Sequence, residues 1–302
     1  MKQLDFYKQN NLNNNTEVFN YFLETMIPNN RTWDYFLNWD KIVSNAEEYS
    51  SELDSLNILC GSSSFDEELR SVIKKNPSII KVFPLLLAIR DKKISVLDSF
   101  SLPEFHFKDF NFNKLIDEEE LDLFVEFFKK SGLKDLISSG RITNIHDYVL
   151  GVEAGLDTNA RKNRGGTIME GIVKNLLTNV YSLNESNFIE QATAKKVQKL
   201  WGINLPTYKT NWTPDFIVKS NNKLFCIETN FYSSGGSKLK STCKEYKETY
   251  KFCKSHRIEF IWITDGGGWK TAKKPIEETF LDTDYIFNLT MIKDGILDEL
   301  FV

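Results

Sequence analysis

The sequence predicts a mixed α/β protein, in which a mainly helical region at residues 1–140 precedes alternating helices and strands at residues 141–302. Three observations support this fold class. Apolar residues recur with a helical period in the first region. From about residue 141, short runs rich in β-branched and aromatic residues alternate with helical stripes. The 302 residues, 41% of them hydrophobic, are enough to bury a large core.

The helices of the first region are predicted from apolar spacing. Helical periodicity runs through Val18–Met26, Leu69–Ile73 and Ile79–Ile89. Residues 117–130 begin with acidic and end with basic side chains, as the helix dipole favours. Most of residues 1–140 is therefore expected to be helical.

The second region has a defined order of elements. The expected elements are a helix around Met169–Val180, strands at Pro214–Val218 and Leu224–Phe231, a helix at Ser237–Ser255, and strands at Ile258–Thr264 and Tyr285–Leu289. The polar turn Ser220–Lys223 makes the first two strands an antiparallel pair. Lysines cover the outer faces of the second helix, which is therefore basic and amphipathic.

Two carboxylates form the first candidate site. Asp215 follows a proline at the start of one strand, and Glu228 lies thirteen positions later in the returning strand. At about 3.3 Å per residue, the return places the two acids roughly opposite each other. Converging carboxylates suit a hard cation, and Mg²⁺ is the expected ion, with the backbone carbonyl of Thr229 as a further ligand. The pattern is permissive, and two unrelated strand acids remain the alternative.

Charge is distributed unevenly along the chain. The net charge is −4, yet residues 1–140 hold 16 Lys and Arg against 23 Asp and Glu, whereas residues 141–302 hold 22 against 19. Within residues 195–257 the counts are 13 and 4, and two of these acids are Asp215 and Glu228. A positive field around a carboxylate pair suits a polyanion and indicates a metal-dependent nuclease.

The order of helix, antiparallel strands, helix and strand resembles the common core of the PD-(D/E)xK nuclease fold. Many nucleases of this fold carry lysine two positions after the second acid, where this chain has Asn230. An amide can orient water but supplies no charge and no base, so we expect Lys238, after two glycines at a helix start, to supply the charge. Glu170 is a further catalytic candidate, with a solvent-facing pair to Lys174 as its alternative.

Several polar residues are candidates for contact with DNA. The segment 157–166 holds Arg161, Lys162, Asn163 and Arg164. We interpret this segment as a DNA-gripping loop ahead of a helix, and a plain solvated loop capped at Thr167 is the alternative. Further contacts are expected from Ser237, Lys238, Lys240 and Lys270. The segment Asp265–Lys270 lacks the full spacing of a nucleotide-binding loop and predicts a turn, either beside the active site or merely ending a strand.

Other classes of protein are disfavoured. The three histidines are far apart, and the four cysteines lack the spacing of a zinc site or a disulfide framework, so reduced core thiols are expected. No apolar stretch approaches the roughly 18 to 20 residues of a membrane span, and the first residues lack a signal-peptide run. We expect a cytoplasmic protein without a membrane partner.

Taken together, these segments resemble the DpnII/MboI group of type II restriction endonucleases. The similarity is carried by His146–Gly166, Asp215–Lys219, Ile227–Leu239 and Phe260–Lys273. It is strong over about residues 140–290 and looser in the helical region. It implies Mg²⁺-dependent cleavage of double-stranded DNA at GATC, on the 5′ side of the G, with adenine methylation blocking the cut. Members of the group carry Asn at the position of Asn230.

The resemblance also implies partners. A palindromic target cut on both strands implies a homodimer, and the host's own sites require a cognate adenine methyltransferase. The helical region would then embrace DNA or form the dimer. Two rival functions remain: a repair or junction-cleaving nuclease of the same fold, and a non-cleaving, methylation-sensitive DNA-binding protein.

Overall fold

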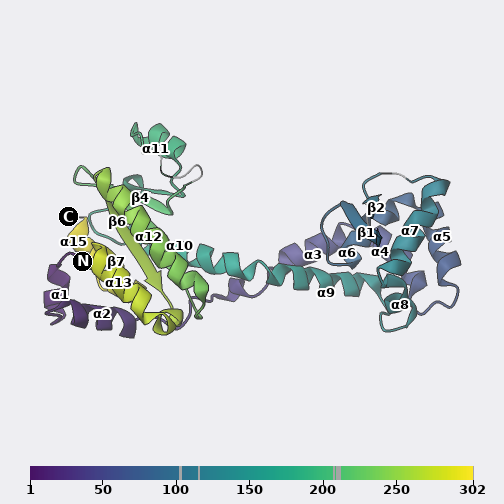
Figure 1. Cartoon of the computed structure of the whole chain (residues 1–302), viewed down its shortest axis with the longest axis horizontal. Coiled ribbons are helices and arrows are strands. Elements are labelled where there is room, and N and C mark those ends of the chain that lie inside the picture. The colour runs from purple at the N-terminus through teal and green to yellow at the C-terminus, as the bar shows by residue number, and fades with distance from the viewer. Residues whose placement is uncertain (102–103, 115, 207, 209–211, 302) are drawn as a thin grey trace. The chain divides into compact units, whose positions relative to one another are not determined.

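The computed structural model describes residues 1–101, 104–114, 116–206, 208 and 212–301. The chain divides into two compact units (Figure 1). We call them the sheet unit, which comprises Met1–Tyr35 and Lys162–Val302, and the helical unit, which comprises Phe36–Arg161. This division differs from the single boundary expected near residue 140, because the first 35 residues pack with the sheet.

The sheet unit is built on five strands in the order β3–β4–β5–β6–β7. The strands are β3 Phe188–Glu190, β4 Phe216–Ser220, β5 Lys223–Phe231, β6 Ile258–Asp265 and β7 Tyr285–Phe287. β3, β4 and β5 are antiparallel, and β6 and β7 run parallel to β5. The expected strand pair is confirmed. β4 begins two residues later than expected, at Phe216, and it ends two residues later, at Ser220. The later end arises because Asn221 and Asn222, with φ of 47° and 61°, make a two-residue turn up to which both strands extend.

Helices surround this sheet. They are α1 Asp5–Gln9, α2 Asn15–Glu24, α10 Arg161–Thr178, α11 Ala194–Trp201, α12 Ser237–Ser255, α13 Lys273–Asp282, α14 Leu289–Lys293 and α15 Ile296–Leu300, with short 3₁₀ turns η1 Trp33–Tyr35, η4 Glu185–Asn187 and η5 Gly267–Thr271. α12 has the expected bounds and lies along β6 and α13 (Figure 1). Its Tyr246 packs edge-on against Trp262 of β6, with ring centroids 5.0 Å apart. All four cysteines are free, and three of them are buried.

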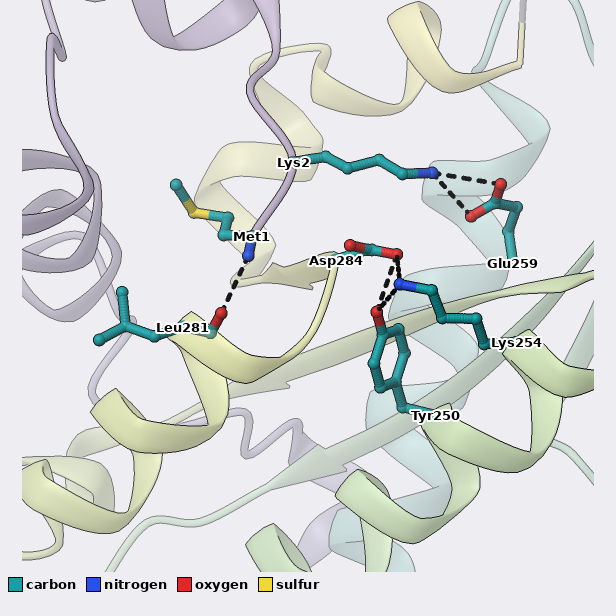
Figure 2. A network of polar contacts seen from close by, with 7 residues as sticks. All are labelled: Met1, Lys2, Tyr250, Lys254, Glu259, Leu281 and Asp284. Carbon is teal, nitrogen blue, oxygen red and sulfur yellow. Dashed lines mark hydrogen bonds and ion pairs between the residues drawn. The ribbon is translucent and has the colours of Figure 1, made fainter.

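The first residues form polar contacts with the rest of the sheet unit (Figure 2). The amine of Met1 donates to the carbonyl of Leu281 at 3.0 Å, and Lys2 forms an ion pair with Glu259 of β6 at 3.1 Å. The α2 residue Phe22 is fully buried, and its ring lies 5.3 Å from that of Phe280 in α13. The N-terminal segment therefore shares the hydrophobic core of the sheet.

The helical unit has its own core. Its elements are α3 Trp39–Glu47, α4 Ser50–Leu56, η2 Asn57–Leu59, α5 Phe65–Lys75, η3 Pro77–Val82, α6 Phe83–Leu86, β1 Lys93–Ser101, β2 Glu104–Asn111, α7 Glu118–Lys130, α8 Leu133–Ser138 and α9 Ile145–Thr158. The antiparallel pair of β1 and β2 was not predicted from the helical periodicity of this region. Among the described residues, no helix combines the length and apolar character needed to cross a bilayer.

Candidate active site

Asp215 and Glu228 lie opposite each other on the antiparallel pair β4 and β5. Phe216 pairs with Ile227, so Asp215, one residue before β4, lies across from Glu228. The Oδ2 atom of Asp215 accepts hydrogen bonds from the backbone N–H of Thr229 at 2.7 Å and from its hydroxyl at 2.9 Å. The two acids are therefore brought together, and Asp215 is held by the strand that carries Glu228.

Glu228 is enclosed by aromatic residues. Only 8% of the residue is exposed. Its Oε1 atom accepts a hydrogen bond from the indole N–H of Trp212 at 3.0 Å. The hydroxyl of Tyr246, from α12, acts to lower the pKa of this carboxylate. The carboxylate is therefore buried and oriented, and its interactions with a charge are stronger than they would be in water.

Burial, together with a neighbouring negative charge in each case, raises the pKa values of both acids. Burial raises the pKa of Asp215 to about 6, against the hydrogen bonds from Thr229, and the charge of Glu170 adds to the rise. Burial likewise raises the pKa of Glu228 to about 8, and the charge of Asp215 adds to it, whereas the bonds from Trp212 and Tyr246 oppose it. A buried acidic pair of this kind requires protons or a bound cation to balance its charge.

Glu170 faces this pair from α10. Its Oε2 atom accepts a hydrogen bond from the side chain of Gln191 at 2.8 Å, and the backbone N–H of Gln191 donates to the carbonyl of Asp215 at 2.7 Å. The alternative pair with Lys174 is not formed, because Lys174 pairs with Glu190 at 2.7 Å. Glu170 is therefore placed near Asp215, with Gln191 between the helix and the strand.

The donor set fits a hard divalent ion. Among the residues that the structure describes, no group of three or more His, Cys, Asp and Glu side chains could hold a metal. Two carboxylates, a nearby backbone carbonyl and water are nevertheless the usual protein ligands of Mg²⁺, which keeps several of its waters. An ion here would therefore be held by Asp215 and Glu228, with the carbonyl of Thr229 as the further protein ligand.

Asn230 is oriented by a chain of hydrogen bonds. The indole N–H of Trp269 donates to the hydroxyl of Thr264 at 2.8 Å, and this hydroxyl donates to Oδ1 of Asn230 at 2.5 Å. The Nδ2 atom of Asn230 is buried and has no hydrogen-bond partner in the described part of the chain. A buried amide donor without a partner is suited to bind a water or phosphate oxygen that enters the site.

The two glycine-containing loops pack against each other. The backbone N–H of Gly268 donates to the carbonyl of Tyr232 at 2.8 Å, which joins the turn η5 to the loop ahead of α12. The residues expected to contact DNA on these loops, and at the start of α12, are all exposed: Ser237, Lys238, Lys240 and Lys270. The segment Asp265–Lys270 is thus a turn whose buried Trp269 supports Asn230.

The expected loop at residues 157–166 is helical instead. α9 ends at Thr158 and α10 begins at Arg161, so the two glycines lie inside α10. The glycines are tolerated because a glycine costs a helix only about 1 kcal/mol, and α10 is stabilised by the burial of residues such as Val173.

The basic residues of this segment therefore extend from a helix. Arg161 donates to the carbonyl of Phe36, and Arg164 donates to that of Tyr35, each at 3.0 Å. Asn163 is exposed. The side chain of Lys162 lies outside the described residues.

Two contributors to the site were missed from the sequence. Trp212 donates a hydrogen bond to Glu228, and Tyr246 acts to lower the pKa of Glu228, yet neither residue belongs to a charged motif. The available indication for Trp212 was its position shortly before the proline and Asp215, because the N–H of a buried indole usually finds a hydrogen-bond acceptor. Tyr246 lies on the apolar face of its helix and packs on Trp262, so its spacing indicated a core residue only.

Comparison with known proteins identifies the family. The model of the DpnII restriction endonuclease family matches residues 18–299. The chain belongs to the DpnII restriction endonuclease family. The type II restriction enzyme MjaIII of Methanocaldococcus jannaschii is 44% identical over 288 residues, which cover 93% of this chain and 98% of that enzyme. No solved structure matches the chain at a significant level.

Two further relatives of the DpnII family cover similar lengths. The type II restriction enzyme LlaDCHI of Lactococcus lactis subsp. cremoris is 38% identical, over 93% of this chain and 94% of that enzyme. The type II restriction enzyme DpnII of Streptococcus pneumoniae is 33% identical, over 94% of this chain and 99% of that enzyme. The chain is accordingly a type II site-specific deoxyribonuclease, a class of enzyme that acts on double-stranded DNA.

In this family member, the acidic pair makes folding stability depend on pH when divalent ions are removed. Acids with raised pKa values hold protons in the folded state that the unfolded chain releases. Stability is therefore highest below the unfolded pKa values of 3.8 and 4.5, and is lost as the pH rises through about 6 for Asp215 and about 8 for Glu228.

The prediction is that, in EDTA, the melting temperature of the wild type falls between about pH 5 and about pH 8. Glu228→Gln should remove most of this fall and melt higher than the wild type at about pH 8, by about 4 °C or more. Differential scanning fluorimetry measures both. An equally steep fall in the Glu228→Gln variant would show that this carboxylate does not cause it.

Proposed function

We propose that the chain cleaves both strands of DNA at 5′-GATC-3′, on the 5′ side of the G, in a Mg²⁺-dependent reaction that adenine methylation of the site blocks. The observation that carries this proposal is the juxtaposition of Asp215 and Glu228 across β4 and β5. It occurs in a chain that matches the DpnII family over residues 18–299. We also propose that the sheet unit is a PD-(D/E)xK core, because an acidic strand pair is flanked by helices as in that fold.

The proposed reaction is hydrolysis of a phosphodiester bond. Mg²⁺, when bound, activates a water and neutralises charge on the phosphate. Asp215, Glu228 and the carbonyl of Thr229 hold the ion. Asn230 positions the attacking water or a phosphate oxygen through its buried Nδ2 atom, which has no partner among the described residues. Glu170 adds negative charge beside Asp215 and helps to orient the site.

Positive charge comes from the loops around the pair. Lys238 supplies the cation that Asn230 cannot. It is exposed in the first turn of the long helix α12, where the helix N-terminus also favours a phosphate. Contacts to DNA are assigned to Ser237, Lys240 and Lys270, and to Arg161, Lys162, Asn163 and Arg164. The lysines of α12 extend this surface along the helix.

Two partners follow from the proposed target. A palindrome cut on both strands requires two active sites, so we propose a homodimer with one site for each strand. A cognate adenine methyltransferase protects the host sequence. The helical unit is available to embrace DNA or to form the dimer.

Digestion of matched plasmids tests the proposal. Unmethylated plasmid in Mg²⁺ should give discrete fragments whose sequenced ends begin with GATC. The same plasmid from a strain with adenine methylation at GATC should remain intact, and EDTA should stop the reaction.

Other outcomes separate the alternative functions. Smeared products or cuts confined to branched DNA would favour a repair or junction-cleaving nuclease. Binding without any cleavage would favour a methylation-sensitive DNA-binding protein. Cleavage at another defined sequence would retain the enzyme class and reject GATC.

A further inference from the structure

Trp212 makes a direct contact with one of the two acids of the site. Its indole N–H donates to Oε1 of Glu228 at 3.0 Å. An indole N–H is a donor only, so it can bind a carboxylate oxygen but cannot bind a metal ion or replace a ligand. The bond has no part in the roles assigned above to the acids, the amide and the lysines.

The ring of Trp212 is held by other aromatic side chains. It lies edge-on to Tyr208, with centroids 5.3 Å apart, and edge-on to Phe252 of α12, with centroids 5.7 Å apart. The ring centroids of Tyr208 and Phe252 lie 4.5 Å apart, so these two rings also pack against each other. We call these three residues the aromatic cluster. Edge-on packing on two sides restricts the rotation of the indole, and therefore fixes the direction of its N–H.

The contact at Glu228 has a counterpart at Asp215. Oδ2 of Asp215 is held by two donors of Thr229, and Oε1 of Glu228 is held by Trp212. In each acid, a protein donor thus fixes one carboxylate oxygen. Donors that orient metal-binding side chains in this way commonly set the affinity of a metal site.

We propose that Trp212 is a positioning residue: its N–H fixes the carboxylate of Glu228 in the orientation that directs the second oxygen toward a divalent ion shared with Asp215. This inference rests on the proposed function, since it assumes that the acidic pair binds an ion. The aromatic cluster holds the indole in place, and α12 thereby supports the site through Phe252 as well as through Tyr246.

Binding of Ca²⁺ to the whole chain without DNA, measured by calorimetry, tests this role apart from cleavage. Trp212→Phe keeps an aromatic ring and removes the N–H. Replacement of Trp212 by benzothienylalanine exchanges the N–H for sulfur at nearly constant shape, which separates the hydrogen bond from packing. Both changes should weaken Ca²⁺ binding about tenfold. The Mg²⁺ concentration for half-maximal cleavage should rise by a similar factor, while the rate at saturating Mg²⁺ changes by less than about threefold.

Trp201→Phe is the matched control, because the indole N–H of Trp201 donates to the carbonyl of Ser186 at 3.1 Å. This control should bind Ca²⁺ like the wild type. Unchanged Ca²⁺ affinity in the benzothienylalanine protein would overturn the role of Trp212. So would a loss of cleavage that saturating Mg²⁺ does not restore. If the wild type and Asp215→Ala bind Ca²⁺ with equal affinity, the acidic pair is not a metal site. That result would reject the proposed function as well.

Discussion

Replacement of Asp215 or Glu228 by alanine is expected to reduce cleavage of GATC-containing plasmid by at least about 10³-fold, because either change removes half of the acidic pair. Binding of a GATC duplex should be retained, since the lysines and arginines assigned to DNA contact are unchanged. Gel-based cleavage rates in Mg²⁺ and duplex affinity in Ca²⁺ measure the two properties separately.

Loss of folding would not explain such a result. Burial is the main reason that both pKa values are raised, so removing either carboxylate removes the cost of burying its charge in the metal-free protein. Glu190→Ala serves as a control, because this acid pairs with Lys174 rather than with the site. Full cutting by either Asp215→Ala or Glu228→Ala would remove the metal assignment.

The second large effect is expected at Gly268, where the two glycine-containing loops meet. A Cβ atom at this position would lie 2.5 Å from the carbonyl oxygen of Ser234 and 2.7 Å from that of Tyr232. Both oxygens belong to the backbone, so the loops would have to separate. Gly268→Ala should therefore destabilise the chain by about 2 to 3 kcal/mol and lower its melting temperature by roughly 5 to 10 °C.

Gly267→Ala is the matched control one position earlier. A Cβ atom at Gly267 meets nothing within 4 Å, so its effect on melting should be small. We expect Gly268→Ala also to slow cleavage, because the displaced loop precedes Ser237 and Lys238 at the start of α12. Equal melting temperatures for the two variants, measured by scanning fluorimetry, would refute the tight approach of the loops.

Much of the sheet unit follows from local sequence. Apolar, β-branched runs predicted β4, β5 and β6, and the basic, amphipathic pattern of residues 237–255 predicted α12. The polar turn between β4 and β5 determined the register that places Asp215 beside Glu228. These features were predictable because each depends on residues within one element or one short turn.

Other features were not predicted because local patterns were ambiguous. The glycines at 165 and 166 suggested a loop, whereas they lie inside α10. The pair β1 and β2 lies in a region where helical periodicity dominates. In both cases packing of the whole unit outweighs a modest local preference.

The order of elements and the pairing of the two acids were determined by the sequence alone, since apolar periodicity and a two-residue turn act over short distances. Only the tertiary structure decided that Trp212 contacts Glu228, that Trp269 supports Asn230 through Thr264, and that the N-terminal segment joins the sheet. The backbone N–H of Ile27, for example, donates to buried Asp265 at 2.8 Å across 238 positions. Such contacts form when separate apolar surfaces are buried together, and no local pattern specifies which surfaces meet.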